Sequence, residues 1–250
     1  MRFFAIFCIL IKAVLAAEIV EESVTHAGAK FRVVHLDPQQ VEIVWKDANG
    51  ALYRTFDQVQ AAYAKQEKTV KFLMNAGIFE PGGIPSGLHI EGGKTLRPLN
   101  LADAPGNFFF KPNGVCTLGI GNMAGPFIGT CAAWQARIDL AKRKRSFGTE
   151  NWGVQSGPML LIDGQRHPAF KDGSASKLHR NGVGIDRKGQ LVFAITEKGE
   201  VVNFWDLSGL FLKLGCKNAL FLDGGISQTV VNPDMPVSSN LFGAMFVVVE

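Results

Sequence analysis

Residues 219–229 read Ala219-Leu220-Phe221-Leu222-Asp223-Gly224-Gly225-Ile226-Ser227-Gln228-Thr229. The apolar run that opens this stretch predicts a strand buried on both faces. Asp223 ends the run, and the surroundings at the mouth of a buried strand can tune the pKa of such a carboxylate. Gly224 and Gly225 can take positive φ and let the backbone approach a ligand closely. Because Asp-Gly is also common in hairpin turns, the stretch predicts either a site or a turn.

The segments before this stretch predict a helix and a hairpin. Large apolar residues share one helical stripe that Gly215 terminates, namely Phe204, Leu207, Phe211 and Leu214. The predicted helix leads directly into the strand that begins at Ala219. Further upstream, residues 182–186 and 191–196 are apolar runs on either side of Arg187-Lys188-Gly189. We expect these runs to pair as a hairpin.

The first half of the chain predicts more strands. Residues 31–36 and 41–45 are apolar and β-branched, and the turn-forming residues 37–40 between them predict another hairpin. Residues 70–74 predict a further strand. Strand patterns of this kind recur along the chain without an internal repeat or a low-complexity linker.

Two further helices are predicted outside the C-terminal stretch. Thr55 and Gln58 have the spacing of a capping box, which predicts a helix over residues 57–68. Residues 130–142 predict another helix, although their apolar faces are mixed. Together these patterns predict an α+β fold, a strand-rich single domain with mixed or antiparallel sheets and two to three helices.

The bulk composition is that of an ordinary globular protein. The chain has 250 residues, 47% hydrophobic and 19% charged, which is long enough for one large core or two small ones. The net charge of +4 includes the run Lys142-Arg143-Lys144-Arg145, which predicts a solvated helix end or loop or, alternatively, a patch for an anionic polymer. Basic residues are not interleaved with aromatic ones, so we expect no nucleic-acid partner.

The N-terminus predicts a signal peptide at residues 1–17. Arg2 supplies the positive start, residues 3–11 the apolar stretch, and Val14-Leu15-Ala16 or the next residue a small-residue cleavage site. The apolar stretch is too short to span a bilayer. We therefore expect residues 18–250 to form a soluble periplasmic or secreted domain, with no stable membrane insertion after signal removal.

The cysteines and histidines do not predict a metal site. Cys8 would leave with the signal peptide, so the mature chain keeps Cys116, Cys131 and Cys216 and can form at most one internal disulfide. A Cys116–Cys131 pair is one prediction, and buried free cysteines are the other. No His-x-His, His-Glu-x-x-His or Cys-x-x-Cys spacing occurs, so we expect no metal and no cofactor. We expect the scattered His167 and His179 to be surface residues.

Several predicted strands end in polar side chains, which a rigid scaffold can present to one cleft. These are Asn75, Lys111, Asn113, Gln155, Ser156, Arg180, Asn181, Asp186, Asp223 and Ser227. Arg180 offers a planar fork for a phosphate or carboxylate, and the amides and hydroxyls suit a sugar. Asp186 and Asp223 could share the acid, base or nucleophile duties of glycoside cleavage. Simpler interpretations are turn-forming roles for Asn75, Asn113 and Asp186, and a surface ion pair for Arg180.

Short motifs follow one another in a distinctive order from about Val70 to the C-terminus. They are Asn75-Ala76-Gly77-Ile78-Phe79, Ser86-Gly87-Leu88, Leu96-Arg97-Pro98-Leu99-Asn100, Gly106-Asn107-Phe108, Lys111-Pro112-Asn113-Gly114, Gln155-Ser156-Gly157-Pro158-Met159-Leu160, His167-Pro168-Ala169-Phe170, Arg180-Asn181-Gly182-Val183-Gly184 and Leu222-Asp223-Gly224-Gly225. Together they resemble the phosphodiester glycosidase family, which includes the eukaryotic N-acetylglucosamine-1-phosphodiester α-N-acetylglucosaminidase. The chain looks most like small exported bacterial members.

The resemblance implies an α+β catalytic domain that hydrolyses a sugar 1-phosphodiester, with a cleft at strand ends. The residues that fall on recurring motif positions are Asn75, Gln155, Ser156, Gly157, Arg180, Asn181, Asp186, Asp223, Gly224, Gly225 and Ser227. Ile226 stands where relatives often have glycine or serine, and Ala76 where others have glycine. Ile226 could therefore narrow the cleft or change the sugar preference.

The sequence supports two functional hypotheses. The first is an exported hydrolase in which Arg180 and the backbone amides of Gly224 and Gly225 hold the phosphate. Asp223 would be the leading carboxylate and Asp186 the second. The remaining polar residues would contact substrate, with Asn75, Gln155, Ser156 and Asn181 positioning the sugar. The alternative is a non-catalytic binding module for an anionic envelope polysaccharide, for which the basic run at residues 142–145 would matter more.

Overall fold

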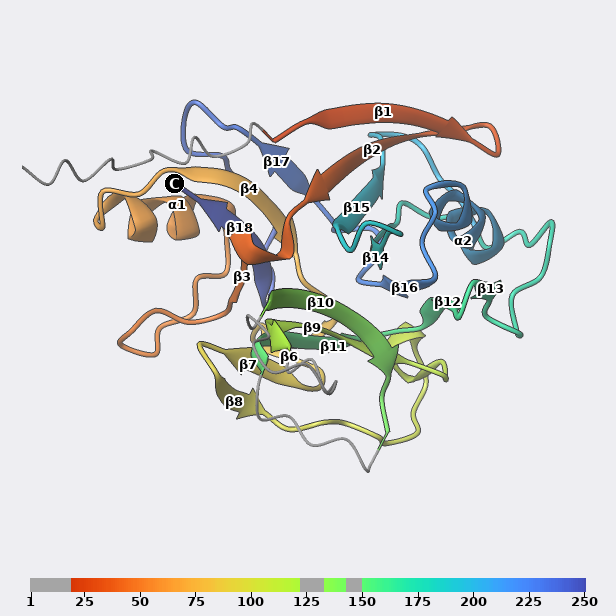
Figure 1. Ribbon diagram of the computed structural model, residues 1–250, viewed down its shortest axis with the longest axis horizontal. Coiled ribbons are helices and arrows are strands. Elements are labelled where there is room, and N and C mark those ends of the chain that lie inside the picture. Colours follow the sequence, from red (N-terminus) through yellow and green to blue (C-terminus); the bar gives the residue numbers. More distant parts are fainter. Residues whose placement is uncertain (1–18, 122–132, 143–149) are drawn as a thin grey trace, which may run out of the picture.

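The computed structural model describes residues 19–121, 133–142 and 150–250, and these form a strand-rich α+β fold (Figure 1). The fold is 12% helical and 41% strand, which confirms the predicted class. The strands form three larger sheets and a two-stranded ribbon, and within the described residues the paired strands run antiparallel. The predicted signal peptide lies outside the described residues, so its boundary stays a prediction.

The seven-stranded sheet contains the predicted central strand. Its order is β1-β2-β15-β14-β16-β12-β13, with bounds Glu21–His26, Ala29–Leu36, Leu191–Thr196, Asn181–Ile185, Asn218–Phe221, Met159–Ile162 and Gln165–Arg166. β16 is flanked by strands on both sides and is buried from Ala219 onward, as predicted. β14 and β15 form the predicted hairpin.

Helix α2 (Phe204–Lys213) covers one face of this sheet and confirms the predicted helix. The Asn203 side chain caps its first turn by accepting a hydrogen bond of 2.8 Å from the Asp206 N–H. Leu207, Leu210 and Phe211 are buried against the sheet. Burial of this stripe fixes the helix directly before the strand that leads to Asp223.

The four-stranded sheet has the order β17-β4-β18-β3, with bounds Thr229–Val231, Val70–Asn75, Met245–Val249 and Val41–Val44. Helix α1 (Phe56–Ala64) packs on it through Phe56, Val59 and Tyr63. The predicted capping box does not form, because Thr55 makes no side-chain cap. The Phe56 N–H instead donates to the Ser239 hydroxyl at 3.0 Å.

The predicted hairpin over residues 31–45 is wrong. β2 pairs with β1 and β15, whereas β3 pairs with β18 in the other sheet. The short 3-10 helix η1 (Pro38–Gln40) carries the chain from one sheet to the other. Both strands have the expected pattern, but their partners come from distant parts of the sequence.

The five-stranded sheet has the order β10-β9-β11-β7-β8, with bounds Ala133–Leu140, Gly114–Gly121, Glu150–Ser156, His89–Glu91 and Lys94–Arg97. The predicted helix over residues 130–142 is wrong where it falls on described residues, because β10 pairs along its whole length with β9. Ile138 is buried beside an exposed Arg137, which is the alternation of a strand. The ribbon joins β5 (Phe79–Glu80) to β6 (Ile84–Pro85), and a second 3-10 helix, η2, spans Asn107–Phe109.

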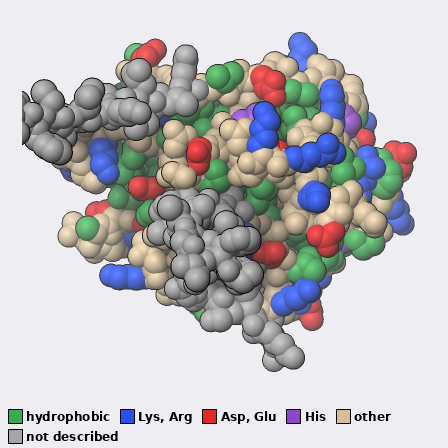
Figure 2. Space-filling view, in the orientation of Figure 1, with side chains coloured by type: hydrophobic (Ala, Val, Ile, Leu, Met, Phe, Trp, Pro, Cys, Tyr) green, Lys and Arg blue, Asp and Glu red, His purple; other side chains and the backbone are tan. Residues whose placement is uncertain are grey.

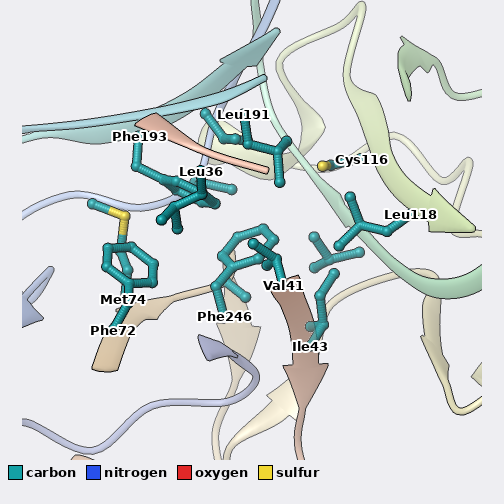
Figure 3. Close-up of a cluster of buried hydrophobic side chains, with 14 of the residues drawn as sticks. Leu36, Val41, Ile43, Phe72, Met74, Cys116, Leu118, Leu191, Phe193 and Phe246 are labelled. Atoms are coloured by element: carbon teal, nitrogen blue, oxygen red, sulfur yellow. The ribbon is translucent and has the colours of Figure 1, made fainter. Parts of the chain in front are cut away.

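The three larger sheets share one apolar core (Figure 3). Phe193 of the seven-stranded sheet lies 5.0 Å from Phe72 and 4.9 Å from Phe246 of the four-stranded sheet, measured between ring centroids. Leu118 of the five-stranded sheet joins the same cluster. This common core fixes the strand ends of different sheets relative to one another, which a site built from those ends requires.

Cys116 and Cys216 are buried free thiols, which was one of the two predictions for the cysteines. Because Cys116 is a free thiol, the predicted Cys116–Cys131 disulfide is wrong, and Cys131 itself lies outside the described residues. Neither described helix is long and apolar enough to cross a membrane.

Candidate active site

Polar residues from two sheets meet in one hydrogen-bonded group. Asn75 ends β4, Asn181 begins β14, and Asp223 and Ser227 follow β16. Asn181 Nδ2 donates to Asn75 Oδ1 at 3.0 Å, and the Asp223 N–H donates to Asn181 Oδ1 at 2.9 Å. Asn75 Nδ2 donates to Ser227 Oγ at 3.3 Å. We call these four residues the asparagine network.

The network needs amide side chains because Asn75 and Asn181 each donate one hydrogen bond and accept another. Asn75 and Asn181 are 1% and 0% exposed, and a buried amide must have its hydrogen bonds satisfied within the protein. Asn75 Oδ1 also accepts from the Gln228 N–H at 3.2 Å. The two asparagines therefore fix the backbone before and after the Asp223 turn.

Asp223 is the carboxylate of this network. Its Oδ1 accepts a hydrogen bond of 2.7 Å from the Gly224 N–H. Burial raises the pKa of Asp223 to about 6, against the lowering effect of the Gly224 hydrogen bond. A carboxylate that titrates near neutral pH is suited to take or give a proton during catalysis.

The paired glycines leave space beside this carboxylate. Neither takes the positive φ that their sequence allows. A Cβ added at Gly225 would have no heavy atom within 4 Å, and one at Gly224 would make only ordinary contacts. The turn is closed by the Ser227 N–H, which donates to the Gly224 carbonyl at 2.8 Å. The open side of the turn is therefore free for a ligand.

Ser156 lies next to the network and holds backbone. Its hydroxyl donates to the Leu222 carbonyl at 2.9 Å and accepts from the Ile78 N–H at 3.4 Å. Gly77 has φ +120°, and a Cβ there would approach the Ser156 side chain to 3.3 Å. Ser156 thus connects the end of β11 to the segments that carry Asn75 and Asp223.

Arg180 is a buried cation without a counter-charge among the described residues. It is 1% exposed, and its guanidinium lies 3.8 Å from the Phe204 ring centroid and 5.5 Å from that of Phe221. Nε donates to the Val202 carbonyl at 2.9 Å and Nη2 to the Ser176 carbonyl at 3.2 Å. Nη1 has no partner, and no described carboxylate lies within salt-bridge distance. Burial lowers the pKa of Arg180 to about 10.

Arg180 and the Asp223 turn adjoin the same aromatic ring. The Asn181 N–H donates to the Asp223 carbonyl at 3.3 Å, so Arg180 precedes β14 beside the end of β16. A Cβ at Gly224 would lie 4.0 Å from Phe221 Cζ, and the guanidinium lies near that same ring. The guanidinium and the turn after Asp223 therefore both lie close to Phe221.

Asp186 is not part of this group. It follows the opposite end of β14, where its Oδ1 accepts from the Lys188 and Gln190 N–H groups at 2.8 and 3.0 Å. It borders a separate cavity of about 670 Å³ with Arg137, Arg187 and Lys217. Because β14 runs the length of the sheet between the two carboxylates, this placement argues against their predicted partnership.

Gln155, Asn113 and Lys111 also point elsewhere. Gln155 Oε1 accepts from the Leu88 and Asn100 N–H groups at 3.0 and 2.8 Å. Asn113 Nδ2 donates to the Phe108 carbonyl at 2.9 Å. Lys111 is exposed and pairs with Asp103. These side chains hold loops in place, away from the asparagine network.

Gly157 allows two backbone segments to approach closely. A Cβ there would lie 2.6 Å from the Asn113 Cβ and 2.9 Å from the Phe108 carbonyl oxygen. We expect Gly157→Ala to lower the free energy of unfolding by about 1–3 kcal/mol, because the backbone must shift. Urea unfolding measures the change, and Gly225→Ala, which meets open space, should stay within about 0.5 kcal/mol of wild type. Equal stability of the two variants would contradict this interpretation of the packing.

Two residues beside the network were not expected from the sequence. His179 is half-buried and its ring lies between Thr196 and the Ser227 carbonyl, whereas we expected a surface residue. Thr196 is 2% exposed at the end of β15. His167, also expected on the surface, is buried and stacks on Phe170. Only the position of His179 directly before Arg180 could have drawn attention to it.

The described residues contain no group of three or more His, Cys, Asp or Glu side chains placed to hold a metal ion. The predicted lack of a cofactor stays a prediction.

The fold and the site define a strand-rich α+β protein in which a carboxylate with a raised pKa lies among amide and hydroxyl groups. Residues 68–244 match the phosphodiester glycosidase family. The uncharacterized protein YigE of Escherichia coli strain K12 is 35% identical over 196 residues, covering 78% of this chain and 71% of that protein. The chain belongs to the phosphodiester glycosidase family, as its motifs led us to expect.

Solved structures share the fold. The catalytic domain of zebrafish N-acetylglucosamine-1-phosphodiester α-N-acetylglucosaminidase, auto-inhibited by its pro-peptide, matches with a TM-score of 0.63 and 13% identity, covering 92% of this chain and 82% of that one. A hypothetical protein from Synechocystis matches with a TM-score of 0.53 and 14% identity, covering 92% and 61%. At these identities the matches establish a common fold.

Proposed function

We propose that the protein is an exported hydrolase that cleaves a sugar 1-phosphodiester and releases the sugar from a phosphorylated acceptor. The observation that carries the proposal is Asp223, whose carboxylate has a raised pKa, whose backbone N–H is bound by Asn181, and which precedes a turn with open space at Gly225. The guanidinium of Arg180, with its unpartnered Nη1, supplies a buried positive charge beside Phe221. Family membership supports the hydrolase class.

A single carboxylate fits this reaction better than ordinary glycoside cleavage. Hydrolysis adds water across the bond between the anomeric carbon and the phosphate oxygen, so the sugar gains the hydroxyl and the acceptor keeps a phosphomonoester. An alkoxide leaving group needs a second, acidic carboxyl group. A phosphomonoester has its second ionisation near about pH 6 and can leave without such help. Among the described residues, Asp223 is the carboxylate of the asparagine network, and it would act as nucleophile or base.

Substrate binding would use groups of the Asp223 turn together with Arg180, whose partner Ser176 would have to move. The phosphate would accept hydrogen bonds from Nη1 of Arg180 and from the Gly225 N–H, whereas the Gly224 N–H is used by the Asp223 carboxylate. Because the guanidinium is buried, the Ser176 carbonyl that covers Nη2 would have to yield to a phosphate oxygen. Asn75, Asn181 and Ser227 are buried, so they would hold the Asp223 turn in place and would not themselves contact the sugar.

The pKa of Asp223 sets an expected pH dependence. If the carboxylate acts as base or nucleophile, only its ionised form is active, so kcat/KM should rise with pH and level off above the pKa of about 6. Initial rates on one sugar phosphodiester between about pH 4 and pH 8 measure this profile. A rate that falls as pH rises through this range would assign Asp223 the role of general acid instead.

The function itself is tested by incubating the protein with a nitrophenyl phosphodiester of a sugar and, separately, with envelope glycans. Release of free sugar is the expected result. Retention on the glycan without release would favour the alternative, a non-catalytic module for an anionic polysaccharide. Figure 2 shows both Lys and Arg and Asp and Glu side chains on one face of the molecule.

A further inference from the structure

We propose that His179 is a positioning residue that holds the turn after Asp223, and that it does so as the neutral imidazole protonated on Nε2. The inference rests on the proposed function, since it assigns a role in the same site. His179 reaches the turn from outside the asparagine network. Its ring contacts both that turn and the end of β15.

The contacts of His179 span the site. Nε2 lies 3.0 Å from the Ser227 carbonyl oxygen, and Nδ1 lies 2.7 Å from Thr196 Oγ1. The His179 carbonyl is 3.7 Å from the position of a Cβ on Gly224. The ring therefore fastens the far end of the Gly224–Ser227 turn to β15, while Asn75 holds Ser227 Oγ from the other side.

The partners of the ring decide where its proton lies. A carbonyl oxygen can only accept, so Nε2 must carry hydrogen. In the neutral ring Nδ1 then accepts from the Thr196 hydroxyl, whose oxygen in turn accepts from the Arg180 N–H at 3.1 Å. A protonated ring would turn the Thr196 hydrogen toward the Arg180 carbonyl, which is 3.5 Å away. We assign the neutral ring, in which the Thr196 hydroxyl hydrogen lies on the 2.7 Å contact with Nδ1 and not on the 3.5 Å contact with the Arg180 carbonyl.

This chain of hydrogen bonds connects the Arg180 backbone to the turn that follows Asp223. It begins at the Arg180 backbone, passes through Thr196 and His179, and ends at the Ser227 carbonyl. The turn it holds contains Gly224, whose N–H bonds the Asp223 carboxylate. Loss of the His179 contact would therefore loosen the carboxylate, and not only the fold.

Two matched substitutions separate the contacts of the ring. The glutamine side chain of His179→Gln can donate from the position of Nε2, whereas the shorter amide of His179→Asn lies near the position of Nδ1 and does not reach the Ser227 carbonyl. We expect His179→Gln to retain kcat within about threefold and His179→Asn to lose about 10- to 100-fold in kcat with little change in KM. His35→Asn, at a site beside Glu22 and Asp186, is the control and should match wild type.

A second pair and a spectrum keep the inference testable if a His179 variant fails to fold. Thr196→Ser should retain activity, whereas Thr196→Val should lose about tenfold or more in kcat. The ring nitrogen-15 shifts of wild-type His179 should report hydrogen on Nε2 and none on Nδ1.

The outcomes distinguish this inference from the proposed function. If wild type is active and Asp223→Asn is not, but the Gln and Asn variants of His179 have equal kcat, the positioning role is overturned and the hydrolase stands. A ring protonated on Nδ1 overturns the assigned tautomer. A wild-type protein that releases no sugar from any phosphodiester refutes the proposed function and, with it, the role given to His179 in catalysis.

Discussion

Asp223→Asn is expected to fold normally and to lose about 10³-fold or more in kcat on a sugar 1-phosphodiester. Asparagine has the same shape as aspartate, and its oxygen can still accept from the Gly224 N–H. The backbone N–H at this position still donates to Asn181. The substitution therefore removes the nucleophile or base and keeps the turn. Initial-rate kinetics on the purified variant measure the loss.

The same substitution should make the protein more stable at neutral pH. Burial raises the pKa of Asp223 from 3.8 to about 6 in the folded protein, so folding favours the protonated form. This contribution to stability is present below the unfolded pKa and is lost as pH rises through about 6. The asparagine side chain of the variant cannot ionise, so at pH ~7 the free energy of unfolding should rise by about 1–2 kcal/mol. Urea unfolding at about pH 4 should give no such gain.

Asp186→Asn is the matched comparison, because it changes a carboxylate at the other end of β14. It should keep activity close to wild type, since its side chain caps the β14–β15 turn. Full activity of Asp223→Asn together with an inactive Asp186→Asn would reverse the assignment of the leading carboxylate.

Local patterns predicted the elements that depend on neighbours in sequence. The stripe of Leu207 and Phe211 and the stop at Gly215 identified α2, and the apolar run at Ala219 identified β16. Pairing partners were harder, because they are chosen by contacts between distant strands. β2 and β3 look like a hairpin in sequence, yet each finds its partner elsewhere. Residues 133–140 have a mixed pattern that favours a helix, because nothing local reveals their pairing with β9.

The sequence predicted which types of residue form the site, but not which of the candidate residues meet there. Asn75, Asn181, Asp223 and Ser227 were all identified as strand-end polar residues, and they meet. Gln155 has the same signature but faces Leu88 and Asn100, since it alternates with Ser156 along one strand. Which face a side chain takes depends on the register of the strand and the loops packed on it. Sequence order alone does not contain that information.

Arg180→Met is expected to raise KM for the phosphodiester by about 10- to 100-fold, the effect of losing a hydrogen bond between charged groups. Methionine can fill the space over Phe204 without a charge. The free energy of unfolding should change by less than about 2 kcal/mol, because removing an unpaired buried charge offsets the lost bonds to Val202 and Ser176. Kinetics and urea unfolding on the same preparation measure both effects.

The phosphate role of Arg180 separates from a purely structural one by the choice of inhibitor. Sugar 1-phosphate should inhibit the Arg180→Met variant more weakly than wild type by the same factor as the rise in KM, whereas the free sugar should inhibit both equally. Arg180→Lys keeps the charge but not the planar fork. Its inhibition by sugar 1-phosphate should be weaker than that of wild type and stronger than that of Arg180→Met. If the guanidinium served only to pack on Phe204 and bind Val202, its loss would weaken inhibition by sugar 1-phosphate and by free sugar to the same extent. We expect the selective loss of inhibition by sugar 1-phosphate, because Nη1 is a buried donor without a partner. Such a donor costs stability unless a ligand accepts its hydrogen bond.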